Sequence, residues 1–310
     1  MGIGALRQSE AEATPDMSEL EHLRRENAAL RQQLGLAVAE APVQSWAVAV
    51  ELPLEDRSQP TLGKASAVQD KIALFRSLFR GREDVYAVRW ENERSGKKGY
   101  APACEGPWSP KGQPRTYLPL TEQVVRDHLA GEKTIGIFPL LKDSSCWFLA
   151  CDFDKDGWQL DALAFLEVCG RYGTPAYLER SRSGNGGHVW IFFSAPIPAV
   201  QARQLGMRLL RHTIDARGDM DLGSYDRFFP NQDFMPKGGF GNLIAAPLQK
   251  KCRALGNSEF VDASTPELKS WPDQWSFLSG VRRLLPAQLE ALIETLPPVS
   301  VGAAGEGRPA

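Results

Sequence analysis

One stretch constrains the fold more than any other: a run of apolar residues that ends in two carboxylates. Residues 147–151 read Trp-Phe-Leu-Ala-Cys, which is typical of a β-strand buried on both faces. Asp152 and Asp154 follow, and because strand side chains alternate, both point to one side while Phe153 returns to the core. Neighbouring carboxylates repel each other unless a cation lies between them, and Mg²⁺ is the simplest such cation. Taken alone, the motif favours the simpler interpretation, a solvated strand end that runs into an Asp/Gly turn.

Composition places the chain among globular proteins. It has 310 residues, of which 43% are hydrophobic and 24% charged, and its formal net charge is −2. This length suits one large domain or two modest ones. Because the net charge is close to zero, any surface for nucleic acid must be a local basic patch.

The sequence indicates a cytoplasmic protein without a membrane span. No apolar run approaches the ~20 residues that a membrane helix needs, and the N-terminus lacks a secretory signal pattern. The five cysteines form no C-x-x-C pair, so we expect reduced thiols, most of them in the core. They are Cys104, Cys146, Cys151, Cys169 and Cys252.

The N-terminal region carries a short heptad pattern. Residues 1–16 are small and polar, and we expect them to be disordered. Residues 17–36 place four leucines at 3-4 spacing with Asn27 at an a position, which is tolerated in parallel dimers because it sets the register. The segment is short enough to be instead a docking helix for a partner, a helix on its own domain or a frayed helix. Residues 37–67 have a linker composition.

Helical and strand patterns alternate from residue 68 to residue 298, which predicts α/β (α+β) architecture. We expect the loop 93–115 between the first two strands and a disordered Gly/Ala/Pro tail at 299–310. The expected helices cover about 70–81, 121–129, 160–172, 199–216, 276–283 and 286–296. The expected strands cover about 85–90, 134–141, 147–153, 176–179, 189–193 and 242–248.

A glycine-rich loop leads into His188 at the start of a strand. Its glycines allow backbone N–H groups to approach an anion, and nearby arginines supply positive charge. The alternative is a hairpin turn with a hydrogen-bonded core histidine, but the arginines shift the interpretation toward phosphate binding. The nucleotide-binding candidates here are Arg180, Arg182, Ser183, Gly184, Asn185 and His188.

A third polar segment follows later in the chain. Asp233 is a candidate third metal ligand, with a turn-capping carboxylate as the alternative, and Asp226 competes for the same role. Lys237 and Asn242, in the glycine-spaced segment that follows, are added to the nucleotide-binding candidates. Three carboxylates beside a cationic phosphate cradle are what two-metal nucleotidyl transfer requires.

These motifs resemble the archaeo-eukaryotic primase, or primase-polymerase, superfamily, and most closely the primase domain of TOTE conflict systems. Those are predicted defence loci that combine primase, helicase and nuclease modules. The resemblance extends over about residues 68–285. It is carried by residues 71–81, 146–154, 179–190, 229–233 and 238–244.

The resemblance implies roles for particular residues. Asp152, Asp154 and Asp233 match metal ligands for two Mg²⁺ or Mn²⁺ ions, and His188 matches a ligand of the nucleotide phosphate. It also implies an RRM-like sheet packed with a second α/β subdomain, a DNA template or primer, a dNTP or NTP substrate, and helicase and nuclease partners. Gly186 stands where the superfamily usually has serine, so the role of that serine passes to Ser183 or to backbone amides.

The chain departs from its relatives at one cysteine segment. Cys104 lies where TOTE relatives commonly begin a zinc-knuckle-like cluster, yet no further cysteine follows before Cys146. A lone cysteine cannot form a tetrahedral site, so we expect no zinc.

The sequence therefore predicts a template-dependent nucleotidyltransferase, a primase-polymerase. A non-catalytic nucleic-acid-binding module that recruits helicase or nuclease partners is one alternative. A metal-dependent nuclease is another, although it leaves the phosphate cradle unexplained.

Overall fold

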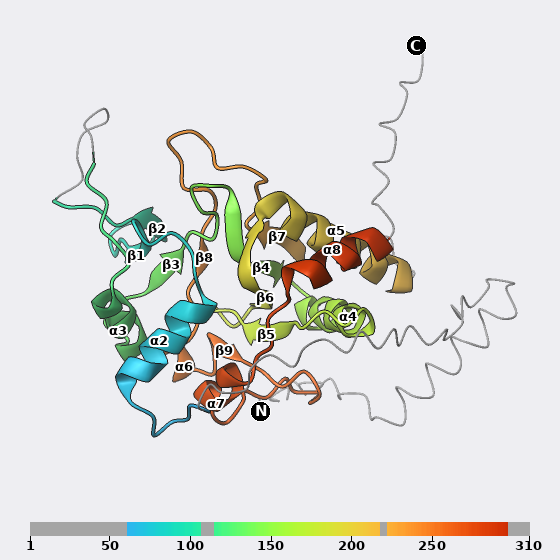
Figure 1. Cartoon of the computed structure of the whole chain (residues 1–310). Coiled ribbons are helices and arrows are strands. Elements are labelled where there is room, and N and C mark those ends of the chain that lie inside the picture. Colours follow the sequence, from blue (N-terminus) through green and yellow to red (C-terminus); the bar gives the residue numbers. More distant parts are fainter. Residues whose placement is uncertain (1–60, 107–114, 218–221, 297–310) are drawn as a thin grey trace, which may run out of the picture. The chain divides into compact units, whose positions relative to one another are not determined.

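The strand with the two carboxylates lies inside a five-stranded antiparallel sheet of order β7-β4-β6-β5-β9 (Figure 1). The computed structural model describes residues 61–106, 115–217 and 222–296. The sheet and its helices comprise β4 (Ser145–Asp154), α4 (Trp158–Arg171), β5 (Tyr177–Arg180), β6 (Gly186–Pro198), α5 (Ala199–Arg217), β7 (Tyr225–Phe229) and β9 (Glu259–Phe260). The run from β4 to β7 follows β-α-β-β-α-β order, so the expected RRM-like sheet is confirmed.

A second sheet forms the other part of the fold. Its four antiparallel strands have the order β2-β1-β3-β8. They are β1 (Ala87–Glu91), β2 (Lys98–Pro102), β3 (Ile135–Ile137) and β8 (Ile244–Ala245). The remaining helices are α2 (Val68–Leu78), α3 (Glu122–Ala130), α6 (Lys250–Arg253), α7 (Gln274–Ser279) and α8 (Pro286–Thr295).

The alternation of β4 divides the interior into two cores. Leu149, Cys151 and Phe153 lie in the core formed with α4, α5 and α8. Phe148 and Ala150 lie in the other core, which includes side chains of α2, α3 and the second sheet. Asp152 is in phase with this second set, so its carboxylate is on the face of the sheet that meets the second subdomain.

Local signals account well for several helix ends. The Thr121 hydroxyl accepts a hydrogen bond from the backbone of Val124 at the start of α3, and Gly131 ends the helix with φ of 89°. Asp273 caps α7 in the same way. Caps of this kind explain why α3 and α7 begin within two residues of their expected starts.

Three strands of the structure were not predicted from the sequence. β2 lies inside the segment expected to be the loop 93–115, and β7 and β9 were not expected at all. A turn around Asn92, whose side chain accepts from two following backbone amides, reverses the chain into β2. These strands are short, and they are defined by pairing with distant strands more than by their own pattern.

Only part of the predicted terminal segments falls within the described residues. The expected disordered segment 1–16, the helix 17–36, most of the linker 37–67 and the tail 299–310 lie outside the described residues. Residues 62 and 64 donate backbone hydrogen bonds to Ser279 and Asp273, so the packed part of the chain begins before α2. None of the described helices is both long and apolar enough to cross a membrane.

Candidate functional site

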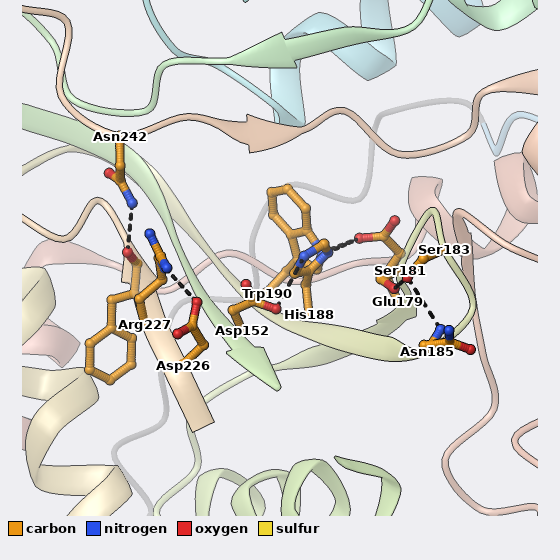
Figure 2. Close-up of polar contacts among 11 residues, drawn as sticks. Asp152, Glu179, Ser181, Ser183, Asn185, His188, Trp190, Asp226, Arg227 and Asn242 are labelled. Carbon is orange, nitrogen blue, oxygen red and sulfur yellow. Dashed lines mark hydrogen bonds and ion pairs between the residues drawn. The ribbon is translucent and has the colours of Figure 1, made fainter. Parts of the chain in front are cut away.

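The two carboxylates at the end of β4 lie between charged neighbours on adjacent strands. Asp152 is opposite His188 on β6 and Arg227 on β7, and its side chain is 17% exposed (Figure 2). Burial raises the pKa of Asp152, and the negative charges of Asp154 and Asp226 raise it further against the opposing charge of His188. A cation at this position would relieve both effects.

A β-bulge places Asp226 next to this pair. Arg227 is opposite Asp152 and Tyr225 is opposite Phe153, so Asp226 is the extra residue of β7. Bulges re-aim a side chain, and the charge of Asp226 acts on Asp152. Its carboxylate accepts a hydrogen bond from Arg227 Nε at 2.6 Å (Figure 2). The bulge therefore places Asp226 close enough for its charge to act on the carboxylates of β4.

Asp233 lies elsewhere. Because β7 runs antiparallel to β4, the residues after Phe229 lead away from Asp152. Asp233 forms an ion pair with Arg203 of α5. Two residues later, the backbone N–H of Met235 donates to the hydroxyl of Ser144, just before β4, at 2.9 Å. Eight residues of strand separate that point from Asp152, or roughly 25 Å. The structure does not bring Asp233 to Asp152 and Asp154.

His188 is held by a carboxylate that the sequence analysis missed. Glu179 Oε2 lies 2.8 Å from His188 Nδ1 and accepts a hydrogen bond from Trp190 Nε1 at 3.0 Å. The other ring nitrogen, Nε2, is 3.5 Å from Asp152 Oδ1. Burial acts to lower the pKa of His188, but Glu179 and Asp152 outweigh it and the pKa is raised. The carboxylates of Glu179 and Asp152 therefore favour the protonated form of this imidazole.

One signal in the sequence could have identified Glu179. It is a charged residue at the end of an expected strand, followed by a turn and a second strand that begins at His188. A hairpin pairs such residues, and in the structure Glu179 is opposite His188. Its side chain is only 1% exposed, which requires a partner for its charge.

The glycine-rich loop is a turn whose amides bond within the protein. The N–H of Gly184 donates to Ser181 O, that of Ser181 to Gly186 O, and that of Asn185 to the Ser183 hydroxyl. These three amides bond within the protein, so phosphate binding by the other groups of this loop stays a prediction.

Two of the glycines allow close packing. A Cβ on Gly186 would lie 2.7 Å from Phe153 O, and one on Gly187 would lie 2.5 Å from the Trp158 ring. The loop must therefore be small to pack against β4 and α4, whatever it binds.

The two arginines of this loop differ in their surroundings. The guanidinium of Arg180 donates to the backbone carbonyls of Gly256 and Leu268 at 2.8 and 2.7 Å, so it fixes the local fold. The charge of Arg182 acts on Tyr100 of the second sheet and on Cys252. It also lowers the pKa of Glu91, although Arg89 has the larger effect on that carboxyl. Arg182 is thus the arginine of this pair that faces the second subdomain.

The last two nucleotide-binding candidates, Lys237 and Asn242, lie between β7 and β8. Asn242 donates to Phe228 O and accepts from the N–H of Asn231, which holds the segment after β7 in place. Lys237 lines a cavity together with Ser144, at the opposite end of β4 from Asp152.

The donor set suits a hard divalent cation. The carboxylates of Asp152, Asp154 and Asp226 offer the oxygen ligands that Mg²⁺ and Mn²⁺ prefer. Asp154 Oδ1 is buried and has no hydrogen-bond partner, which is costly unless it binds something. As the described side chains stand, no three of these acids, histidines or cysteines enclose a metal position, and Arg227 pairs with Asp226 instead.

Comparison with known proteins gave one family and several distant structures. The family model described as TOTE conflict system, Archaeo-Eukaryotic Primase domain matches residues 70–292. No curated protein matches the sequence. The polymerase domain of Mycobacterium tuberculosis ligase D, solved in complex with DNA, is 12% identical over 73% of this chain and 83% of that chain, with a TM-score of 0.36.

The archaeo-eukaryotic primase domain of the cyanophage S-2L primase-polymerase is 18% identical over 58% of this chain and 91% of that one, with a TM-score of 0.29. At such TM-scores neither structure informs the geometry of the site.

Proposed function

The chain belongs to the archaeo-eukaryotic primase domain family of TOTE conflict systems, and we propose that it is a template-dependent nucleotidyltransferase. Its substrates would be a dNTP or NTP and a DNA template or primer. The observation that carries the proposal is the placement of Asp152, Asp154 and Asp226 on the adjacent strands β4 and β7, beside His188 of β6.

Each residue has a distinct part in this proposal. Two bound Mg²⁺ or Mn²⁺ ions would activate the attacking hydroxyl and stabilise the leaving pyrophosphate. Asp152, Asp154 and Asp226 would supply the oxygen ligands. His188, held in place by Glu179, would donate from Nε2 to a phosphate oxygen of the nucleotide. Arg227 offsets the negative charge of Asp226 when no cation does.

The experiment compares aspartate variants in nucleotide incorporation on a primed template. We expect Asp152→Asn, Asp154→Asn and Asp226→Asn to reduce incorporation to background, with the circular dichroism of the folded protein unchanged. Asp233→Asn should keep its activity, because it loses only a half-buried ion pair with Arg203 that is remote from Asp152. Extension by Asp226→Asn together with inactivity of Asp233→Asn would return the third ligand to Asp233, as the sequence first suggested.

The same assay separates the two alternatives. A nuclease would shorten the labelled strand, whereas a non-catalytic module would bind the strand and leave its length unchanged. The buried, unpartnered carboxylate oxygen of Asp154 favours a metal-using enzyme over a binding module. Unprimed template in a parallel reaction would show whether synthesis begins without a primer.

Further parts of the proposal concern partners and metals. We also propose that the protein acts in a defence or conflict system with helicase and nuclease partners, and that its catalytic domain spans residues 68–298. Folding without zinc also stays a prediction: all five cysteines are free thiols, and Cys104 lies in an isolated β-bridge with Tyr117. Elemental analysis of the purified protein tests it, and stoichiometric zinc that survives dialysis would contradict it.

A further inference from the structure

A cavity lies at the other end of β4 from the carboxylates. Its volume is about 420 Å³, within the range of small-ligand pockets. Ser144, which precedes β4, lies on its wall, and the segment after β7 forms one side of it. Asp152 is eight residues farther along β4, roughly 25 Å away. The cavity is therefore separate from the carboxylate site.

The cavity is positively charged. Arg82, Lys142 and Lys237 line it, and no acidic side chain is among the described residues of the lining. Asp84 lies nearby and bonds to Arg82 at 2.7 Å and to Lys142 at 2.9 Å. The hydrogen bond from Arg82 is the main reason that the pKa of Asp84 is far below its usual range, so Asp84 stays ionised. The lining cations outnumber Asp84, the carboxylate that pairs with two of them, and this excess favours an anion.

One of these cations is held rigidly. The side chain of Arg82 is 7% exposed, and its guanidinium lies 5.4 Å from the centre of the Phe240 ring. Lys237, in contrast, is exposed at the tip of the Pro236–Gly239 turn, where Gly238 has φ of 71°. The Nε and Nη2 groups of Arg82 bond to Asp84, and Nη1 lies 3.9 Å from Met235 Sδ, so Arg82 contributes a fixed positive charge while the exposed Lys237 can adjust to a bound phosphate.

Aromatic rings lie next to these charges. Tyr117 and Phe240 line the cavity with ring centres 4.8 Å apart in an edge-to-face arrangement, and Tyr117 is 36% exposed. Phe234, in the segment that leads to the cavity, is 73% exposed. Exposed rings combined with lysine and arginine are typical of surfaces that bind single-stranded nucleic acids, because bases stack on the rings while cations contact the phosphates.

We propose that this cavity binds one nucleotide unit of a single-stranded nucleic acid. Its phosphate would contact Lys142 and Lys237 within the positive field of Arg82, and its base would stack on Tyr117 or Phe234. This inference rests on the proposed function only for the choice of a nucleic acid as the ligand. A strand bound here would reach the carboxylate site several nucleotides away along β4, so the cavity would hold the template or primer strand and not the incoming nucleotide.

The experiment measures binding of a fluorescent single-stranded DNA oligonucleotide to the full chain by anisotropy, without divalent metal or nucleotide. Salt is varied between 50 and 200 mM. The variants are Lys142→Gln, Lys237→Gln, Tyr117→Ala and Phe234→Ala. Phe234 is exposed, so its variant keeps the test valid if Tyr117→Ala fails to fold. Arg171→Gln is the matched control, because Arg171 is an exposed cation on α4, on the opposite face of the sheet.

We expect each lysine variant to weaken binding several-fold and to reduce the slope of log affinity against log salt by about 0.7, the value per phosphate contact on a single strand. The aromatic variants should weaken binding roughly tenfold with little change in slope. Arg171→Gln should bind like the wild type. Asp152→Asn should also bind the oligonucleotide normally, so that a failure of catalysis and a failure of this site give different results.

Three results would overturn the inference. One is wild-type affinity and slope in all four cavity variants. The second is loss of affinity for a labelled mononucleotide with unchanged affinity for the oligonucleotide, which would assign the cavity to the substrate nucleotide. The third is the absence of oligonucleotide binding by the wild-type protein.

Discussion

Replacing Glu179 with alanine should cost about 3–5 kcal/mol of folding free energy, the usual effect of removing one member of a buried ion pair. The side chain is 1% exposed and accepts hydrogen bonds from the buried groups His188 Nδ1 and Trp190 Nε1. Each donor left unsatisfied costs about 1–3 kcal/mol, which leads to the same range. Both donors bond to the same oxygen, Oε2, so the carbonyl oxygen of Glu179→Gln can keep both hydrogen bonds, and its cost should be clearly smaller than that of the alanine variant.

Urea unfolding of the full chain at pH 7, followed by circular dichroism and tryptophan fluorescence, measures these differences. Glu167→Ala is the control, because Glu167 is a carboxylate of α4 that is 74% exposed and pairs only with exposed Arg171; its effect should stay within about 0.5 kcal/mol. An alanine variant of Glu179 within 1 kcal/mol of the wild type would refute the claim that this carboxylate supports the site.

The pH dependence of the same variants carries a definite sign. The pKa of His188 is raised in the folded protein, so the proton is held more tightly there than in the unfolded chain. The stability from the charged pair is complete below the unfolded pKa of about 6.5 and declines as the pH rises through the folded pKa. The difference between wild type and Glu179→Gln should therefore shrink in alkaline buffer, and a constant difference would contradict this assignment.

Three further predictions concern the packing and the N-terminus. Burial lowers the pKa of His128 to about 4. The free energy of unfolding of the wild type should therefore fall by about 3 kcal/mol relative to His128→Gln between pH 7 and pH 4, at up to about 1.4 kcal/mol per pH unit. Urea unfolding at several pH values measures this trend, which would be absent if the imidazole were solvated. Gly187→Ala should destabilise the protein by about 1–3 kcal/mol in the same assay, because the added Cβ would meet the Trp158 ring. Gly170→Ala on α4 is the control and should stabilise the protein slightly, because its added Cβ has no atom within 4 Å. Equal effects of the two variants would refute the packing argument. If residues 17–36 form a parallel coiled coil, light scattering should give a dimer for the full chain and a monomer for a chain that starts at residue 61, and monomers in both cases would leave a partner helix.

Local sequence determined the features that depend on neighbours along the chain. The apolar run of β4 and its alternation place Asp152 and Asp154 on one side because strand periodicity needs no tertiary information. The ends of α3 follow from Thr121 and Gly131 for the same reason, since a cap bonds to amides within a few residues. The long motif blocks also indicated the family, which the match over residues 70–292 confirms.

Only the tertiary structure decided which distant residues meet. Whether Asp226 or Asp233 joins the carboxylates depends on the direction of β7 beside β4 and on a one-residue bulge, and neither is encoded by the spacing between the segments. The contact of Glu179 with His188 and Trp190 similarly depends on hairpin register. The cavity at the other end of β4 joins residues as far apart in the sequence as Arg82 and Phe240, which come together only because the packing of two sheets brings their loops to one place.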